Sequence, residues 1–315
     1  MTTTKLNLLF NNDDANAFSH PHMRDFLSKH FNILIHQPNT QYNKADTILV
    51  VNAYKIENPL ASDWYKPYYN NGYKIIVDNL WEYRGFCDKH FSDPLDTCFV
   101  AYNTNWFWYN ESIWYEYLGY KNYTPNKNIQ KLALMPMRVN RQHRMEMVVR
   151  FSEILDKLIW SYSSFGRSLP GDLPTTHIDY QRYFNPNWYD STYFSIVAES
   201  QFMPGDIFVT EKTFKPMAFY HPMIVMAQPG HLKYIKSQGF ETFENLFDES
   251  YDDEQDWVKR IGLLVNNIKN FQIEQYSTLT LEKLAHNHNL FYNKALIENN
   301  MVNELITPIK EYAET

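Results

Sequence analysis

Short apolar runs alternate with longer, partly amphipathic stretches along most of this chain. Apolar, β-branched runs bounded by Asn, Asp, Pro or Gly are typical of buried strands. In the first third of the sequence they occur at residues 5–10, 32–36, 47–52, 73–78 and 97–103. The spacing predicts helices over residues 17–31 and 62–70. This alternation predicts a first α/β unit built on a doubly wound, mostly parallel sheet.

A second α/β pattern follows a polar segment at residues 123–131, which contains Pro125. We interpret that segment as an interdomain linker, which gives predicted domains at 1–130 and 131–315. Strands are predicted at 132–137, 160–165, 193–198 and 223–227. The first helix of this unit is predicted to run to about Leu158, with Met145, Val148 and Val149 on its apolar face. Further helices are predicted at 212–220, 231–238, from 253 onward, and at 279–314 as one or two helices.

Composition narrows the class of protein. The chain has 315 residues, 44% of them hydrophobic and 21% charged, which predicts a packed core. A net charge of −7 argues against nonspecific binding to nucleic acid. No apolar run approaches the ~18 residues that a membrane span needs, and the first residues do not resemble a signal peptide. With only Cys87 and Cys98 as cysteines, we expect a reduced, cytoplasmic setting.

An aromatic segment at residues 106–120, WFWYNESIWYEYLGY, is apolar on nearly every side of a helix. Aromatic side chains fill cores and interfaces, and they also stack on sugar rings. We favour a segment wedged between the two domains over the alternative, which is a platform for an acceptor sugar.

Polar side chains gather where the predicted strand 193–198 ends and the next helix begins. Ligands of parallel α/β sheets bind at the carboxyl ends of the strands. A carboxylate there can accept hydrogen bonds from ribose hydroxyls, and a helix start with a lysine can hold a diphosphate. Ribose and diphosphate are the shared half of a nucleotide sugar. The alternative is an ordinary helix start with solvated lysines. The residues concerned are Glu199, Ser200, Thr210, Glu211, Lys212 and Lys215.

A second cluster, Arg138, Arg141, His143 and Arg144, lies between the predicted strand 132–137 and the helix after it. Guanidinium groups bind phosphate oxygens in a bidentate manner. Positive charge near a helix N-terminus opposes the helix dipole, and a bound anion would offset that cost. The sequence therefore predicts an anion site here. The alternative is an exposed, basic helix start.

Three segments of the second half resemble the donor-site motif of the α1,3-fucosyltransferases. They are Glu199-Ser200, the run Phe208-Val209-Thr210-Glu211-Lys212, and Pro222-Met223-Ile224-Val225. That family has Glu-Asn-Ser, Tyr-(Ile/Val)-Thr-Glu-Lys and a Val-Pro-Val strand. This chain lacks the Asn, has a longer loop and carries Phe208 in place of the Tyr. It is more similar to fucosyltransferase-like proteins of bacteria and phages, which share Thr-Glu-Lys-Thr-Phe-Lys-Pro and a later Gly-Phe-x-Thr-Phe, here residues 239–243. The resemblance covers roughly residues 130–295.

The resemblance implies a GT-B fold, in which two Rossmann-like domains face each other across a cleft that a C-terminal helix closes. It implies an inverting, metal-independent glycosyltransferase that needs no cofactor and moves a sugar, fucose among the candidates, from a GDP-linked donor to a glycan hydroxyl. Glu211 would hold the ribose, and Lys212 with Arg144, or else Arg141, would hold the diphosphate. Glu199 or Ser200 would lie near the sugar.

An inverting transferase needs a general base to deprotonate the acceptor. Asp78 and Glu82, just after a predicted strand, are the first candidates, and Asp13 or Asp14 comes second; the alternative for each is plain surface charge. Two other classes of protein stay open at this point. One is a noncatalytic nucleotide- or carbohydrate-binding protein with a degenerate GT-B fold, and the other is a phosphorylase or epimerase. We interpret the acidic run at 248–253 as a solvated helix start rather than a metal site.

Overall fold

The computed structural model describes residues 5–11, 17–18, 20–52, 63–80, 98–102, 105–173 and 183–315. Its contacts divide the chain into two compact units. Unit 1 comprises Met1–Asn110 and Lys294–Thr315, and unit 2 comprises Glu111–Asn293. The predicted boundary at residues 130/131 differs from this division, because the division falls inside helix α5 (Trp106–Tyr117) and gives the last helices to unit 1.

Unit 1 is built on a parallel five-stranded sheet in the order β2-β1-β3-β4-β5. The order 2-1-3-4-5 is that of a doubly wound sheet, as the sequence predicted. The apolar runs form the strands because every residue of β3 and four of the five in β4 are buried. The strands are β1 (Asn7–Phe10), β2 (Asn32–Ile35), β3 (Thr47–Asn52), β4 (Lys74–Asp78) and β5 (Phe99–Ala101).

Helices α1 (Pro21–Ser28) and α3 (Lys66–Asn70) accompany this sheet, and the C-terminal helices complete unit 1. α12 (Lys294–Met301) continues through a π-helical turn at Val302–Ile306 into α13 (Thr307–Glu314). The Nζ of Lys74 on β4 donates to the carbonyls of Tyr312 and Ala313, at 2.8 Å each. These hydrogen bonds hold the end of α13 to the sheet of unit 1.

Unit 2 contains a parallel four-stranded sheet in the order β7-β6-β8-β9. Its strands are β6 (Lys131–Met137), β7 (Leu158–Tyr162), β8 (Thr192–Ala198) and β9 (Met223–Met226). The chain leaves β6 toward β7 on one side and leaves β8 toward β9 on the other. The direction of winding therefore reverses between β6 and β8, and such a switch point is where doubly wound sheets bind ligands.

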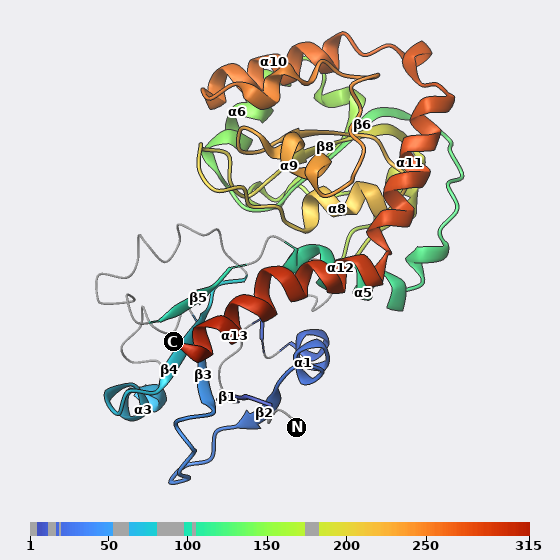
Figure 1. Ribbon diagram of the computed structural model, residues 1–315. Coiled ribbons are helices and arrows are strands. Elements are labelled where there is room, and N and C mark those ends of the chain that lie inside the picture. Colours follow the sequence, from blue (N-terminus) through green and yellow to red (C-terminus); the bar gives the residue numbers. More distant parts are fainter. Residues whose placement is uncertain are drawn as a thin grey trace. The chain divides into compact units, whose positions relative to one another are not determined.

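Helices cover both faces of this sheet: Figure 1 shows α6 and α10 on one side and α8 on the other. The helices are α6 (Gln142–Arg150), α7 (Pro186–Asp190), α8 (Glu211–Ala218), α9 (His231–Ser237), α10 (Trp257–Lys269) and α11 (Thr278–Phe291). The prediction that α6 continues to about Leu158 was wrong, because the helix ends at Arg150 and Leu158 opens β7. The predicted apolar face was also wrong: Met145 and Val149 are 47% and 66% exposed.

The aromatic helix α5 fills the core rather than presenting a platform. Trp106, Trp108 and Tyr115 are fully buried. The ring of Trp106 contacts His20 of unit 1, and the ring of Tyr115 packs edge-on against Phe184 of unit 2 at 4.8 Å between centroids. The burial of these rings argues against a platform for an acceptor sugar.

Candidate functional site

The start of α8 is built as the sequence predicted. Thr210 is the N-cap in an extended conformation, and its Oγ1 accepts a hydrogen bond from the backbone N–H of Lys212. β8 ends at Ala198, so the segment between β8 and α8 lies at the carboxyl edge of the sheet, on the switch-point side. The strand order therefore brings this helix start beside the turn between β6 and α6.

Glu211 and Lys212 form a charged pair on the first turn of α8. The Nζ of Lys212 lies 2.9 Å from Oε1 of Glu211, 3.0 Å from Oγ1 of Thr210 and 3.2 Å from Oγ of Ser200. Burial raises the pKa of Glu211, but the charges of Lys212 and Lys215 outweigh it and hold that pKa at about 2. Both side chains of the pair keep about a quarter of their surface exposed. Glu211 is thus ionised at neutral pH, and both side chains are open to a ligand.

The turn between β6 and α6 adds positive charge to the same edge. Arg141 is exposed at the N-cap of α6, and Arg144 is buried behind it. Burial, together with the charges of Arg144, Arg141 and Lys212, lowers the pKa of His143 to about 3. His143 is therefore neutral, so it adds no charge to the predicted anion site. Its Nε2 donates to the carbonyl of Glu199 at 2.9 Å, which joins the start of α6 to the segment that leads to α8.

The guanidinium of Arg144 is directed at backbone carbonyls. Its Nη1 donates to the carbonyl of Val139 at 3.0 Å, and its Nη2 donates to those of Ala198 and Glu199 at 2.8 and 3.3 Å. Burial and the nearby charge of Arg141 lower the pKa of Arg144 to about 10, which leaves it charged at neutral pH. Arg144 thus ties the β6–α6 turn to the end of β8.

Glu199 has no exposed surface, and its carboxylate faces the helix start. Its two oxygens accept four hydrogen bonds, from the backbone N–H groups of Ser200 and Thr210 and from the hydroxyls of Thr210 and Thr213. Thr213 and its neighbour His231, 3.1 Å away, were not predicted from the sequence. The only sequence signal for Thr213 is its spacing of three from Thr210, which places both on one helix face.

Arg138 and Lys215 are the other residues that were predicted to bind the nucleotide-sugar donor. Arg138 is exposed, and its carbonyl accepts hydrogen bonds from the N–H and hydroxyl of Ser164. Lys215 lies one turn into α8 with its Nζ 4.9 Å from the centroid of Phe184. Burial lowers the pKa of Lys215, while the carboxylates of Glu211, Glu111 and Asp172 raise it. Glu111 and Asp172 were not predicted as neighbours of the site, since they lie far from it in sequence.

Of the candidate bases, the structure describes Asp78; Glu82, Asp13 and Asp14 lie outside the described residues. Asp78 is the last residue of β4 and is 4% exposed. Its two carboxylate oxygens accept hydrogen bonds from the N–H groups of Phe18 and Leu80, at 3.1 Å each. Burial raises the pKa of Asp78 to about 6, although these hydrogen bonds lower it.

The acidic run at 248–253 caps helices. Asp248 accepts a hydrogen bond from the N–H of Ser250 at a short 3₁₀ helix, and Asp252 accepts from the N–H groups of Leu232 and Lys233 at the start of α9. Among the residues that the structure describes, no group of three or more His, Cys, Asp or Glu side chains could hold a metal ion.

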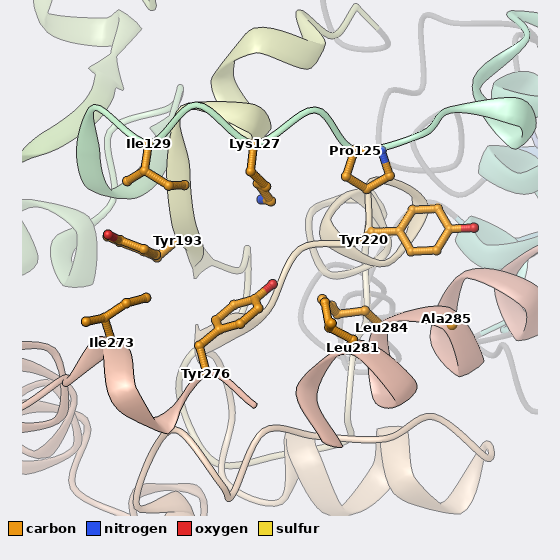
Figure 2. Close-up of a pocket in the computed structure, with 10 residues that line it drawn as sticks. All are labelled: Pro125, Lys127, Ile129, Tyr193, Tyr220, Ile273, Tyr276, Leu281, Leu284 and Ala285. Atoms are coloured by element: carbon orange, nitrogen blue, oxygen red, sulfur yellow. The ribbon is translucent and has the colours of Figure 1, made fainter. Parts of the chain in front are cut away.

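Unit 2 also contains an apolar cavity of about 310 Å³, shown in Figure 2. Tyr193, near the start of β8, and Tyr220, which follows α8, both line it. The candidate site lies at the other ends of these elements, at Glu199 and Thr210. The cavity therefore contains none of the predicted donor residues.

Solved structures of α1,3-fucosyltransferase resemble this chain over its whole length. The crystal structure of an α1,3-fucosyltransferase matches with a TM-score of 0.52 and 12% identity, covering 100% of this chain and 91% of that one. A structure of α1,3-fucosyltransferase with GDP matches with a TM-score of 0.50 and 12% identity, covering 100% and 92%. The α/β GT-B fold predicted from the sequence is confirmed at this level.

Comparison by sequence gives no further match: no protein-family model and no curated protein matches the chain. Within the described part of the chain, no helix is both long enough and apolar enough to span a membrane.

Proposed function

We propose that this protein is a glycosyltransferase that moves a sugar from a nucleotide-sugar donor, GDP-linked and with fucose as one candidate, to a hydroxyl of a glycan acceptor. The observation that carries the proposal is the charged start of α8 beside the basic start of α6, at the switch point of a parallel sheet. The fold resembles α1,3-fucosyltransferase structures, one of which contains GDP.

In this proposal each side chain has a separate role toward the donor. Glu211, held ionised by its lysine neighbours, accepts hydrogen bonds from the ribose hydroxyls. Lys212, Arg141 and the N-terminus of α8 bind the diphosphate. Ser200, Lys215 and the exposed Arg138 lie further out, where the sugar or the base would be held. Arg144 contributes its charge from behind the β6–α6 turn.

A nucleotide panel in a thermal-shift assay tests the proposed donor. A ligand that binds only the folded state raises the melting temperature by mass action. We expect GDP and its sugars to raise it more than UDP, CDP and their sugars. A panel without any stabilising nucleotide would contradict the proposal, and stabilisation without turnover would favour a binding protein.

We expect transfer to be independent of divalent cations. The growing negative charge on the leaving diphosphate would be balanced by Lys212, Arg141, Arg144 and the helix dipole. The rate of sugar transfer should therefore stay within about twofold of its starting value after treatment with EDTA. A rate that EDTA abolishes and manganese restores would contradict this part of the proposal.

Inverting transfer needs a proton acceptor, and we propose Asp78, with Glu82 as the second candidate. The raised pKa of about 6 leaves Asp78 mostly ionised at pH 7 and able to take up a proton. We expect kcat to fall as the pH drops through about 6, and Asp78→Asn to lower kcat by about a hundredfold or more.

The pH effect of Asp78 on folding has the opposite sign. A folded-state pKa above the ordinary value favours folding at low pH, and this contribution is lost as the pH rises through about 6. Acid inactivation near pH 6 would therefore not arise from unfolding driven by Asp78. The exposed Asp25→Asn serves as the control, and a kcat of Asp78→Asn equal to that of this control would exclude Asp78 as the base.

A further inference from the structure

Glu199 is connected to both helix starts of the candidate site. Its backbone carbonyl accepts hydrogen bonds from two side chains of α6, from Nε2 of His143 at 2.9 Å and from Nη2 of Arg144 at 3.3 Å. Its side chain turns the other way and is bonded to Thr210 and Thr213 of α8. One residue therefore joins α6, the end of β8 and α8.

The four groups around the carboxylate are all hydrogen-bond donors. Oε1 accepts from the N–H of Thr210 at 3.1 Å and from the hydroxyl of Thr213 at 2.7 Å. Oε2 accepts from the N–H of Ser200 at 3.1 Å and from the hydroxyl of Thr210 at 2.6 Å. Each oxygen thus faces one backbone N–H, which cannot rotate away. A carboxylate satisfies both sides, whereas an amide would set its NH₂ group against a backbone N–H in either orientation.

The bonds to Glu199 also fix the direction of two hydroxyls. Because the Thr210 hydroxyl gives its proton to Glu199, its lone pairs face the backbone N–H and the Nζ of Lys212, at 3.4 and 3.0 Å. The Thr213 hydroxyl likewise gives its proton to Glu199 and accepts from Nε2 of His231 at 3.1 Å. The carboxylate of Glu199 thereby sets where Lys212 is held.

We propose that Glu199 is a positioning residue, which holds the Thr210–Lys212 helix start in register with the β6–α6 turn so that both face one diphosphate. This inference rests on the proposed function and changes one part of the sequence-based prediction: Glu199 acts through Thr210 and Lys212, and makes no contact with the sugar. Its complete burial and its four internal donors leave the carboxylate no free face.

The test compares Glu199→Gln with the wild-type chain in two measurements. Calorimetric titration with GDP should show binding weakened by about tenfold or more. Hydrogen–deuterium exchange should become faster at the amides of residues 210–213 and remain unchanged at the start of α9. Thr213→Val, which removes one of the four donors, is the milder second variant and should weaken GDP binding by a smaller factor.

A matched control exists in the same unit. Asp252 is also a buried carboxylate at a helix start, where it accepts hydrogen bonds from the N–H groups of Leu232 and Lys233 of α9 at 3.0 and 3.1 Å. Asp252→Asn should speed exchange at α9 and leave the Kd for GDP unchanged. This control separates the positioning effect from a general loss of stability in unit 2.

The possible failures are distinguishable. GDP binding by Glu199→Gln within about twofold of wild type, or equal weakening in Asp252→Asn, would overturn the positioning role. If the wild-type chain binds no GDP, the proposed function fails instead. The hydrogen–deuterium exchange of Glu199→Gln would then still test whether Glu199 holds the Thr210–Lys212 helix start. Unchanged exchange at residues 210–213 would overturn that claim.

Discussion

Replacing Lys212 by alanine is expected to lower kcat by about a hundredfold to a thousandfold. Nζ of Lys212 lies 2.9 to 3.2 Å from oxygens of Ser200, Thr210 and Glu211. Negative charge on the diphosphate grows as the bond to the sugar breaks, so a cation at this position is worth more in the transition state than in the ground state. The loss should therefore be larger in kcat than in the KM for the donor.

Steady-state kinetics with varied donor concentration measures this effect. Lys269→Ala is the control, because Lys269 is a partly exposed lysine of the same unit that pairs with Glu153 at 2.7 Å. A raised KM with an unchanged kcat in Lys212→Ala would show that Lys212 only binds the donor. Unchanged kinetics in both variants would place the diphosphate elsewhere.

Replacing Arg144 by methionine is expected to lower the free energy of unfolding by about 3 kcal/mol. Arg144 is 2% exposed and donates to the carbonyls of Val139, Ala198 and Glu199. Methionine fills much of the space but leaves three carbonyls without this donor. A buried carbonyl that loses a charged hydrogen-bond donor lowers the free energy of unfolding considerably. Removing an exposed arginine side chain changes this free energy little.

Urea unfolding followed by tryptophan fluorescence measures the loss, with exposed Arg141→Met as the control. We expect the control to differ from wild type by less than about 0.5 kcal/mol. Equal stabilities of the two variants would contradict the role of Arg144 as a clamp on the end of β8. Direct contact with the donor would then become the better explanation for this arginine.

The sheets and the start of α8 were predictable because their signals are local. The run 47–52 forms β3 with the predicted bounds, since a short β-branched run between polar residues has few other ways to bury itself. Thr210 was recognised as an N-cap because its hydroxyl and the acidic residue after it suit the exposed N–H groups of a helix start. The end of the predicted strand then placed Glu211 and Lys212 at the carboxyl edge of the sheet.

The orientation of α6 was not predictable from its pattern of apolar residues. The helix buries His143, Arg144 and Met147 and exposes Met145 and Val149. The reason is the end of β8, where His143 and Arg144 of α6 donate hydrogen bonds to the carbonyls of Ala198 and Glu199. The spacing of apolar residues in a helix does not show that its polar side chains will form hydrogen bonds with a distant strand.

Two long-range features could not be predicted from the sequence for a similar reason. The partners of the Glu199 carboxylate on α8 are 11 and 14 residues away, so neither a motif nor a helical spacing joins them to it. The C-terminal helices were assigned to the second domain, yet Lys29 pairs with Glu298 at 2.8 Å and Lys74 holds the end of α13 in unit 1. An amphipathic pattern shows that a helix packs on something, but it does not identify the sheet.

The central claim is that the start of α8 binds a nucleoside diphosphate, and calorimetric titration with GDP tests it most directly. We expect GDP to bind the wild-type chain and the control Lys269→Ala with the same Kd. We expect Glu211→Ala and Lys212→Ala each to bind GDP at least about tenfold more weakly while remaining folded. GDP binding that is unchanged in both variants, or that is absent from the wild-type chain, would contradict it.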